Sequence, residues 1–206
     1  MWCYRAEWAN HITDIINTNK GDTGTVHRYN LCSNTGTYIE TSKHKLDNNV
    51  LLENFNLLSF YHDCKVLSIH KLVNNIVSLQ AVEEELERTN LVIEPGDYVI
   101  IASGYGKNHQ KEDYLTNSPS FEERLTSWII NKNISLIGTD TPIIENKTKP
   151  YEPVQKMFSA NPAMLLLAPL NMDLNTIVTG NYLLNCLPLP IAGSAVAHCR
   201  AVLIKH

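Results

Sequence analysis

Residues 31–44 read Leu-Cys-Ser-Asn-Thr-Gly-Thr-Tyr-Ile-Glu-Thr-Ser-Lys-His, and this stretch decides the fold. Its alternation, together with its threonines and isoleucine, favours a strand over a helix. In an extended strand, successive side chains point to opposite faces. One face would then carry Asn34, Gly36, Tyr38, Glu40, Ser42 and His44. This face presents an amide, a phenol, a carboxylate and an imidazole, and Gly36 leaves space for another group to lie against the backbone.

Composition sets the outer limits of the interpretation. With 206 residues and 44% hydrophobic content, residues 1–206 are expected to form a single domain with a sizeable core. The 17 basic and 21 acidic residues give a formal charge of −4 without a long basic run, which argues against nucleic-acid and anionic-membrane partners. No apolar run reaches the roughly 18 residues of a membrane span.

The cysteines and the first residues indicate the compartment. Cysteine occurs five times, at positions 3, 32, 64, 186 and 199, without C-x-x-C spacing. An odd number without such spacing argues against a disulfide framework and against a cysteine zinc site. Residues 1–10 contain Arg5 and Glu7 and lack the apolar segment of a secretion signal. The sequence therefore predicts a cytoplasmic protein.

Periodicity predicts the remaining elements. Helices are expected at 78–88, with Ser78 as N-cap, and at 120–131, with Ser120 as N-cap. Residues 17–24 are typical of a turn-rich loop. Apolar runs predict strands at 65–70, 98–102, 134–138, 165–170, 177–178, 186–189 and 202–204.

An N-terminal aromatic group and an aspartate after a predicted strand each allow two interpretations. Trp2, Tyr4 and Trp8 form an aromatic group that could pack against the domain or a partner subunit, or could stack on a substrate. Asp140 follows a predicted strand and precedes Thr-Pro. Its carboxylate could accept backbone N–H groups in its own turn, which we favour, or could orient a catalytic group.

The spacing of residues 34–44 resembles the signature H-x-G-T-H-x-D-x-P-x-H. This signature is typical of the metal-dependent cyclase and hydrolase family that includes bacterial kynurenine formamidase and isatin hydrolase. The Gly-Thr pair at 36–37 and His44 match it in register. Asn34 and Tyr38 stand where the family has metal-binding histidines, and Glu40 stands at its metal-binding aspartate. The likeness continues through Pro-Gly-Asp at 95–97, Ser-Gly-Tyr at 103–105 and Gly-Thr-Asp-Thr-Pro at 138–142.

The last family landmark is a histidine followed twelve residues later by a glutamate, both metal ligands. Alignment of the apolar pattern places Lys156 at the histidine and Ala168 at the glutamate. A lysine ammonium has no lone pair to offer, and alanine has no ligand atom. Catalytic zinc or manganese needs three or four ligands from His, Asp, Glu or Cys, so we expect no tightly bound metal and no other cofactor.

The resemblance also implies the architecture. The expected fold is α/β, with a mixed, β-rich core of the swivelling β/β/α type and flanking helices, as in kynurenine formamidase. It further implies a homodimer or a higher homo-oligomer, because family members usually assemble.

The altered site suggests acid/base chemistry without a metal. His44, Glu40 and Tyr38 are the expected catalytic residues, because a neutral imidazole beside a carboxyl group can transfer protons near neutral pH. Asn34, Lys156 and Gly36 are expected to bind the substrate or its oxyanion. The reaction would be cyclisation, isomerisation or ring opening of a small carbonyl, amide or lactone compound, in specialised metabolism. The alternatives are a non-catalytic relative used for binding or assembly and, behind it, a metal-dependent arylformamidase-type hydrolase.

Overall fold

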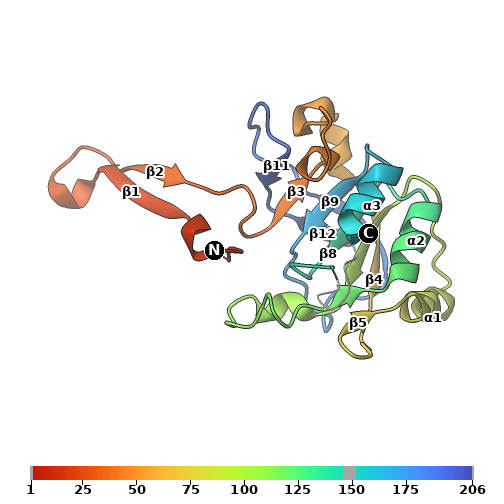
Figure 1. The fold of residues 1–206 in the computed structure, drawn as a ribbon. Coiled ribbons are helices and arrows are strands. Elements are labelled where there is room, and N and C mark those ends of the chain that lie inside the picture. Colours follow the sequence, from red (N-terminus) through yellow and green to blue (C-terminus); the bar gives the residue numbers. More distant parts are fainter. Residues whose placement is uncertain (1, 146–151, 206) are drawn as a thin grey trace.

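The computed structural model describes residues 2–145 and 152–205. Its main sheet has eight strands in the order β11-β3-β9-β8-β6-β4-β10-β12 (Figure 1). The central strands from β4 to β9 run parallel, and the outer pairs are antiparallel. The strands are β3 (Tyr38–Glu40), β4 (Tyr61–Ser68), β6 (Tyr98–Ala102), β8 (Leu136–Thr139), β9 (Leu165–Ala168), β10 (Gly180–Asn185), β11 (Val196–His198) and β12 (Val202–Lys205). The predicted α/β class with a mixed, β-rich core is confirmed.

Three helices accompany the sheet, α1 (Leu79–Thr89), α2 (Glu123–Asn131) and α3 (Pro153–Ala160) (Figure 1). Alternate residues of β6 enter two different cores. Val99 and Ile101 pack with the helices, whereas Tyr98 and Ile100 join the cluster on the other face. A strand buried on both faces reads as one continuous apolar run, which is why the sequence predicts β6 at its observed bounds. No helix in the described part of the chain is both long enough and apolar enough to cross a membrane.

Shorter elements complete the fold. A parallel pair is formed by β5 (Ile76–Val77) and β7 (Ser120–Phe121). The 3-10 helices are η1 (Ala6–Trp8), η2 (Thr18–Lys20), η3 (Ser42–His44), η4 (Leu52–Asn54), η5 (Leu57–Phe60) and η6 (Tyr105–Asn108).

The helix boundaries test the capping predictions. Ser78 caps α1 as expected, because its side chain accepts a hydrogen bond from the Ala81 N–H at 3.2 Å. The predicted start of the second helix is wrong, since Ser120 pairs with Ile76 in the β5–β7 ladder and α2 begins at Glu123. Tertiary pairing therefore overrides a favourable local cap.

The predicted strands at 177–178 and 186–189 are also wrong. The nearby strand is β10, which ends at Asn185. Pro188 and Pro190 lack the N–H groups that a ladder needs, and Pro188 makes only an isolated bridge to Cys199.

A β-hairpin occupies residues 11–30, where the sequence predicts only the turn-rich loop at 17–24. Strands β1 (His11–Ile16) and β2 (Val26–Asn30) pair in antiparallel fashion around the predicted turn. The hairpin projects away from the body of the molecule, and all of its strand residues are exposed (Figure 1).

The stretch 31–44 is only partly extended. Its strand is limited to β3, because Gly36 adopts a positive φ of 59° and residues 42–44 form η3. A single strand through His44, as the alternation predicts, is therefore wrong. The group that lies against Gly36 is the N-terminal segment of the same chain, since the Gly36 N–H donates to the Trp2 carbonyl at 2.8 Å.

Candidate active site

A pocket of about 570 Å³ lies at the β3 and β9 strands, on the helix-bearing side of the sheet. It brings together four of the predicted site residues, Asn34, Tyr38, Glu40 and His44. Further walls come from distant segments, including Tyr4, Trp8, Thr139, Ile144, Val154 and Ala168. The pocket thus combines the 34–44 stretch with the N-terminus, the end of β8 and helix α3.

The Glu40 carboxyl is the most deeply buried acid of the pocket, with 3% of the residue exposed. Burial raises the pKa of Glu40 from its ordinary 4.5 to about 8. The nearby Glu145 raises this pKa further, whereas the Lys45 ammonium opposes the change. At neutral pH Glu40 is therefore mainly a neutral carboxylic acid, which can donate a proton.

His44 stands on η3 directly beside this acid. Its Nε2 lies 3.6 Å from Oε2 of Glu40, slightly beyond hydrogen-bonding distance. Burial lowers the pKa of His44, and the charge of Lys45 lowers it further. The imidazole is therefore a free base at neutral pH. The two side chains form a neutral acid next to a neutral base, which is the arrangement that opposite pKa shifts create in acid/base sites.

The Tyr38 hydroxyl belongs to a chain of hydrogen bonds. The Tyr4 hydroxyl donates to the Pro142 carbonyl at 2.5 Å, so the Tyr38 hydroxyl must donate to Tyr4, at 2.8 Å. The Asn34 side chain is hydrogen-bonded to Tyr38 from the other side, while burial raises the pKa of the Tyr38 phenol. Its proton is engaged by Tyr4, so the Tyr38 hydroxyl would have to exchange this acceptor in order to donate to a substrate oxyanion.

Asp140 lies in the chain between Thr139 and Thr141, which both line the pocket. Its Oδ1 accepts hydrogen bonds from the Ser103 N–H at 2.8 Å and from the Ser103 hydroxyl at 2.9 Å, and its Oδ2 accepts from the Gly106 N–H at 3.4 Å. The favoured prediction, bonds within its own turn, is therefore wrong, since the donors belong to the loop after β6. Gly106 is required there, because a Cβ would lie 2.2 Å from the Leu170 carbonyl oxygen.

Two predicted residues are not brought into the pocket. Lys156 is exposed on α3, and its Nζ lies 3.2 Å from Oε1 of Glu123. Residues two positions apart in a helix point to nearly opposite sides, and Val154 is the α3 residue that faces the pocket. Gly36 lines cavities on the other side of β3.

Tyr4, Thr139 and Thr141 join the site without having been predicted as site residues. Tyr4 was recognised only as one of three aromatic residues with two possible roles. Thr139 and Thr141 lie in the Gly-Thr-Asp-Thr-Pro motif at 138–142, but that motif does not indicate that these side chains line the pocket.

The donor set of the pocket does not fit a catalytic divalent metal. Where the resembled family has metal ligands, the pocket has an amide, Asn34, a phenol, Tyr38, whose pKa is raised, and Ala168, which supplies no donor atom. Its remaining candidate donors are His44 and the carboxyl groups of Glu40 and Glu145. Glu40 is mainly protonated at neutral pH. Within residues 2–145 and 152–205, no group of three or more His, Cys, Asp or Glu side chains could hold a metal ion.

Comparison with known proteins finds a matching family model and several solved structures with a similar fold. A family model described as "Putative cyclase" matches residues 2–146. A "predicted metal-dependent hydrolase" from Bacillus stearothermophilus is similar in structure, with 22% identity, a TM-score of 0.76, and coverage of 97% of this chain and 89% of that one. Isatin hydrolase A from Ralstonia solanacearum has 14% identity and a TM-score of 0.77, with 98% and 86% coverage. No curated protein matches the sequence.

Proposed function

Because the chain belongs to the cyclase family, we propose that it is an enzyme that transforms a small carbonyl, amide or lactone compound by acid/base catalysis without a metal. The observation that carries this proposal is the buried Glu40 carboxyl beside the His44 imidazole, with Nε2 of His44 3.6 Å from Oε2 of Glu40. Burial raises the pKa of Glu40 to about 8 and lowers the pKa of His44, which favours a protonated acid beside a neutral base at neutral pH. A neutral acid and a neutral base in one pocket can act in the same step at neutral pH.

Glu40 and His44 suit a cyclisation in which all protons are transferred between the substrate and these two side chains, without a cofactor. The imidazole of His44 accepts the proton of the substrate's hydroxyl or amine as this group attacks the substrate's own carbonyl carbon. Glu40 donates its proton to the carbonyl oxygen, so that no free oxyanion accumulates. The resulting imidazolium of His44 and carboxylate of Glu40 are then neutralised when the proton passes between them. Isomerisation would use the same pair, with His44 removing a proton next to the carbonyl.

The pocket also defines the kind of substrate. A volume of about 570 Å³ accommodates a compact molecule. Trp8, Ile144 and Leu166 provide apolar wall, and Arg5 and Lys45 contribute the cationic side chains of the lining. Glu145 also lines the pocket and lies 4.0 Å from the Lys45 ammonium, so these cations do not call for an anionic substrate. We propose a compact, partly apolar carbonyl compound. Isatin, a cyclic amide named in the isatin hydrolase neighbour, is a suitable first probe for ring opening by water. In that reaction water would add to the amide carbonyl carbon as His44 accepts its proton, and the C–N bond would break as Glu40 protonates the departing nitrogen.

We further propose a single cyclase-like domain that works in the cytoplasm, in specialised metabolism, as a homodimer or higher homo-oligomer. The cysteines support a reducing compartment, because Cys3, Cys32, Cys64, Cys186 and Cys199 are all free thiols.

Ala168 favours one competing candidate, a cyclase-like protein that binds a ligand but does not transform it. This residue lines the pocket and adds no chemical group to it. The metal-dependent arylformamidase-type hydrolase has less support, because the donor set fits a metal poorly.

Product formation from a panel of isatin, lactones and hydroxy- or amino-ketones separates the candidates. Each compound is incubated with chelator-treated protein and analysed by mass spectrometry. For any compound that is converted, we expect His44→Ala and Glu40→Ala to lower kcat/KM at least 100-fold, whereas His62→Ala, at an exposed imidazole on β4, leaves it unchanged. Full turnover by the His44→Ala variant would contradict the proposal. Binding without conversion of any compound would favour the binding protein.

A further inference from the structure

The two edges of the main sheet are joined by a very short connection. Strands β11 and β12 lie at opposite ends of the strand order, yet only residues 199–201 separate them in the chain. In a flat sheet of eight strands, the two outer strands would lie about 34 Å apart. The chain from His198 to Val202 spans at most about 14 Å, so the sheet must curl until its edges approach each other.

A cavity of about 560 Å³ lies on the concave side of this curl. The second core marks that side, because it gathers residues from β3 and β11 at one edge of the sheet and from β10 and β12 at the other. We call the cavity the second cavity. Its walls include Ile100, Tyr182, Leu184, Arg200, Leu203 and Lys205.

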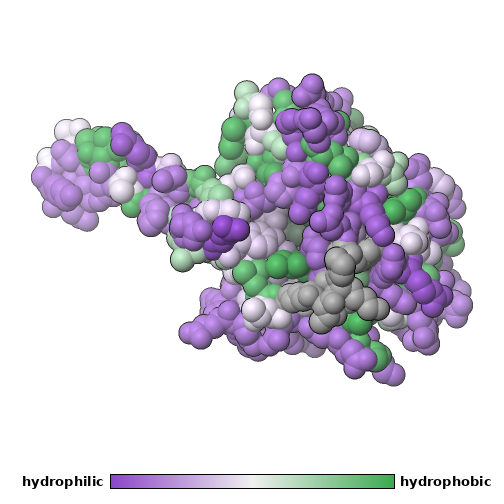
Figure 2. Space-filling model, in the orientation of Figure 1, coloured by the Kyte–Doolittle hydropathy of each residue, from purple (hydrophilic) through white to green (hydrophobic). Residues whose placement is uncertain are grey.

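Strands β10 and β12 give the second cavity an apolar wall that ends in a cation. The register pairs Leu184 with Leu203 and Tyr182 with Lys205, and all four residues line the cavity. Leu203 packs against the second core, and Lys205, two positions further along β12, points to the same side of the strand. The surface drawn in Figure 2 is mainly hydrophilic, so a cavity with such a wall is a distinct feature of this chain.

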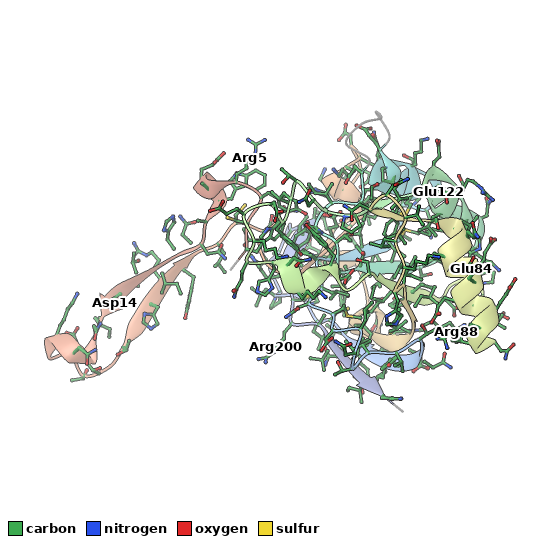
Figure 3. The ribbon with its side chains drawn as sticks, turned by 90° about the horizontal axis from the view of Figure 1, so that it is seen from below. Arg5, Asp14, Glu84, Arg88, Glu122 and Arg200 are labelled. Carbon is green, nitrogen blue, oxygen red and sulfur yellow. The ribbon has the colours of Figure 1, made fainter. Side chains whose placement is uncertain are left out.

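The charge of the second cavity has one sign. Arg200, in the connection between β11 and β12, and Lys205 both line it, whereas none of its described lining residues is Asp or Glu. In Figure 3, Arg200 lies at the margin of the body, apart from the labelled acidic side chains. Within residues 2–145 and 152–205, neither cation forms an ion pair with an acid. The candidate active site differs, because there Glu145 lies 4.0 Å from Lys45.

The other titratable groups of the second cavity suit binding and not catalysis. The Tyr182 hydroxyl donates to a backbone carbonyl at 2.8 Å. Nε2 of His198 lies 2.9 Å from Oγ1 of Thr35. Burial raises the pKa of the Cys199 thiol, and the nearby Cys186 raises it further, so the thiol remains neutral and adds no negative charge. The cavity can therefore hold an anion without transforming it.

We propose that the second cavity binds a small carboxylate with an apolar body, and that Arg200 and Lys205 hold the carboxylate group. The planar fork of an arginine side chain matches a carboxylate, and the apolar wall removes the body of the ligand from water. A cavity of this size accommodates a compact ligand. The site lies on the opposite face of the sheet from the candidate active site, because Ile100 joins the second core whereas Val99 and Ile101 pack with the helices. The proposal does not rest on the proposed function.

Isothermal titration of the full chain with decanoate and with decanol tests this site. We expect the wild type to bind decanoate at least about 10-fold more tightly than decanol, which has the same chain without the charge. Arg200→Gln/Lys205→Gln should weaken decanoate binding at least about 10-fold and should leave decanol binding unchanged, which also shows that the variant is folded. Lys71→Gln/Arg124→Gln is the matched control, since it removes two exposed cations elsewhere, and it should keep the wild-type affinity.

A further variant locates the ligand. Arg5→Gln/Lys45→Gln removes the cations that line the candidate active site and should leave the decanoate affinity unchanged. A loss of affinity in this variant would assign the carboxylate to that pocket and would overturn the proposal. Wild type that does not bind decanoate, or that binds it no better than Arg200→Gln/Lys205→Gln does, would overturn it as well.

Decyl phosphate tests the head group. Tighter binding of decyl phosphate than of decanoate would contradict a site for carboxylates, and weaker binding would support it. Because calorimetry measures binding and not turnover, failure of this proposal and failure of the acid/base proposal are distinguishable.

Discussion

The buried carboxyl of Glu40 gives the folded state an unusual dependence on pH. Its pKa rises from 4.5 to about 8 on folding. Between these values the folded state binds more protons than the unfolded state, so the free energy of unfolding falls as pH rises and levels off above pH 8. A shift of this size corresponds to a loss on the order of 5 kcal/mol.

Glu40→Gln removes the titrating group while keeping its shape. We expect the difference in free energy of unfolding between pH 5 and pH 8.5, measured with urea, to shrink by several kcal/mol in this variant. Glu83→Gln, at an exposed position on α1, is the control and should keep the wild-type difference. Equal pH dependence in all three proteins would show that Glu40 ionises normally.

The proposed acid, Glu40, should also set the pH dependence of kcat/KM. The proposed step needs protonated Glu40 and neutral His44, so kcat/KM should fall about tenfold per pH unit above pH 8. It should also fall below the lowered pKa of His44. In Glu40→Gln the alkaline decrease should disappear, and the plateau should drop about 100-fold or more. A pH profile with a substrate found in the panel measures both, and an unchanged alkaline limb would exclude Glu40 as the acid.

At the scale of elements, Asp140 holds the loop after β6 against the end of β8. Asp140→Ala leaves the N–H groups of Ser103 and Gly106 without their acceptor, and we expect it to lower the free energy of unfolding by about 3 kcal/mol. Asp113→Ala removes an exposed side-chain hydrogen bond to Asn117 and should cost less than about 1 kcal/mol. Urea unfolding compares the two, and equal losses would refute a special role for Asp140.

The secondary-structure elements differ in how well the sequence alone predicts them. Strand β6 and helix α1 could be predicted, because a doubly buried strand and a capped amphipathic helix have strong local signals. The hairpin was missed, because the bulge between Asp14 and Ile16 breaks the two-residue period. Helix α3 was not predicted either, and the alignment that proposed Lys156 could not show which side of that helix faces the pocket.

At the scale of the whole molecule, one short stretch places four predicted site residues in the pocket, and distant segments complete the lining. The spacing and the family resemblance single out Asn34, Tyr38, Glu40 and His44, and all four line one pocket, although the predicted strand ends at Glu40. The upward pKa shift of Glu40 could not be predicted, because it arises from burial by segments distant in sequence. The family assignment and the mixed sheet were predictable, because they rest on motifs spread over most of the chain.

Isothermal titration of chelator-treated protein with zinc and with manganese tests the central claim, a catalytic pocket that works without a metal. We predict no stoichiometric binding of either ion that depends on Glu40 and His44, so that wild type, Glu40→Gln and His44→Ala should give the same titration. Binding of one ion per chain that is lost in both variants would contradict the account and would return metal-dependent hydrolysis to this pocket.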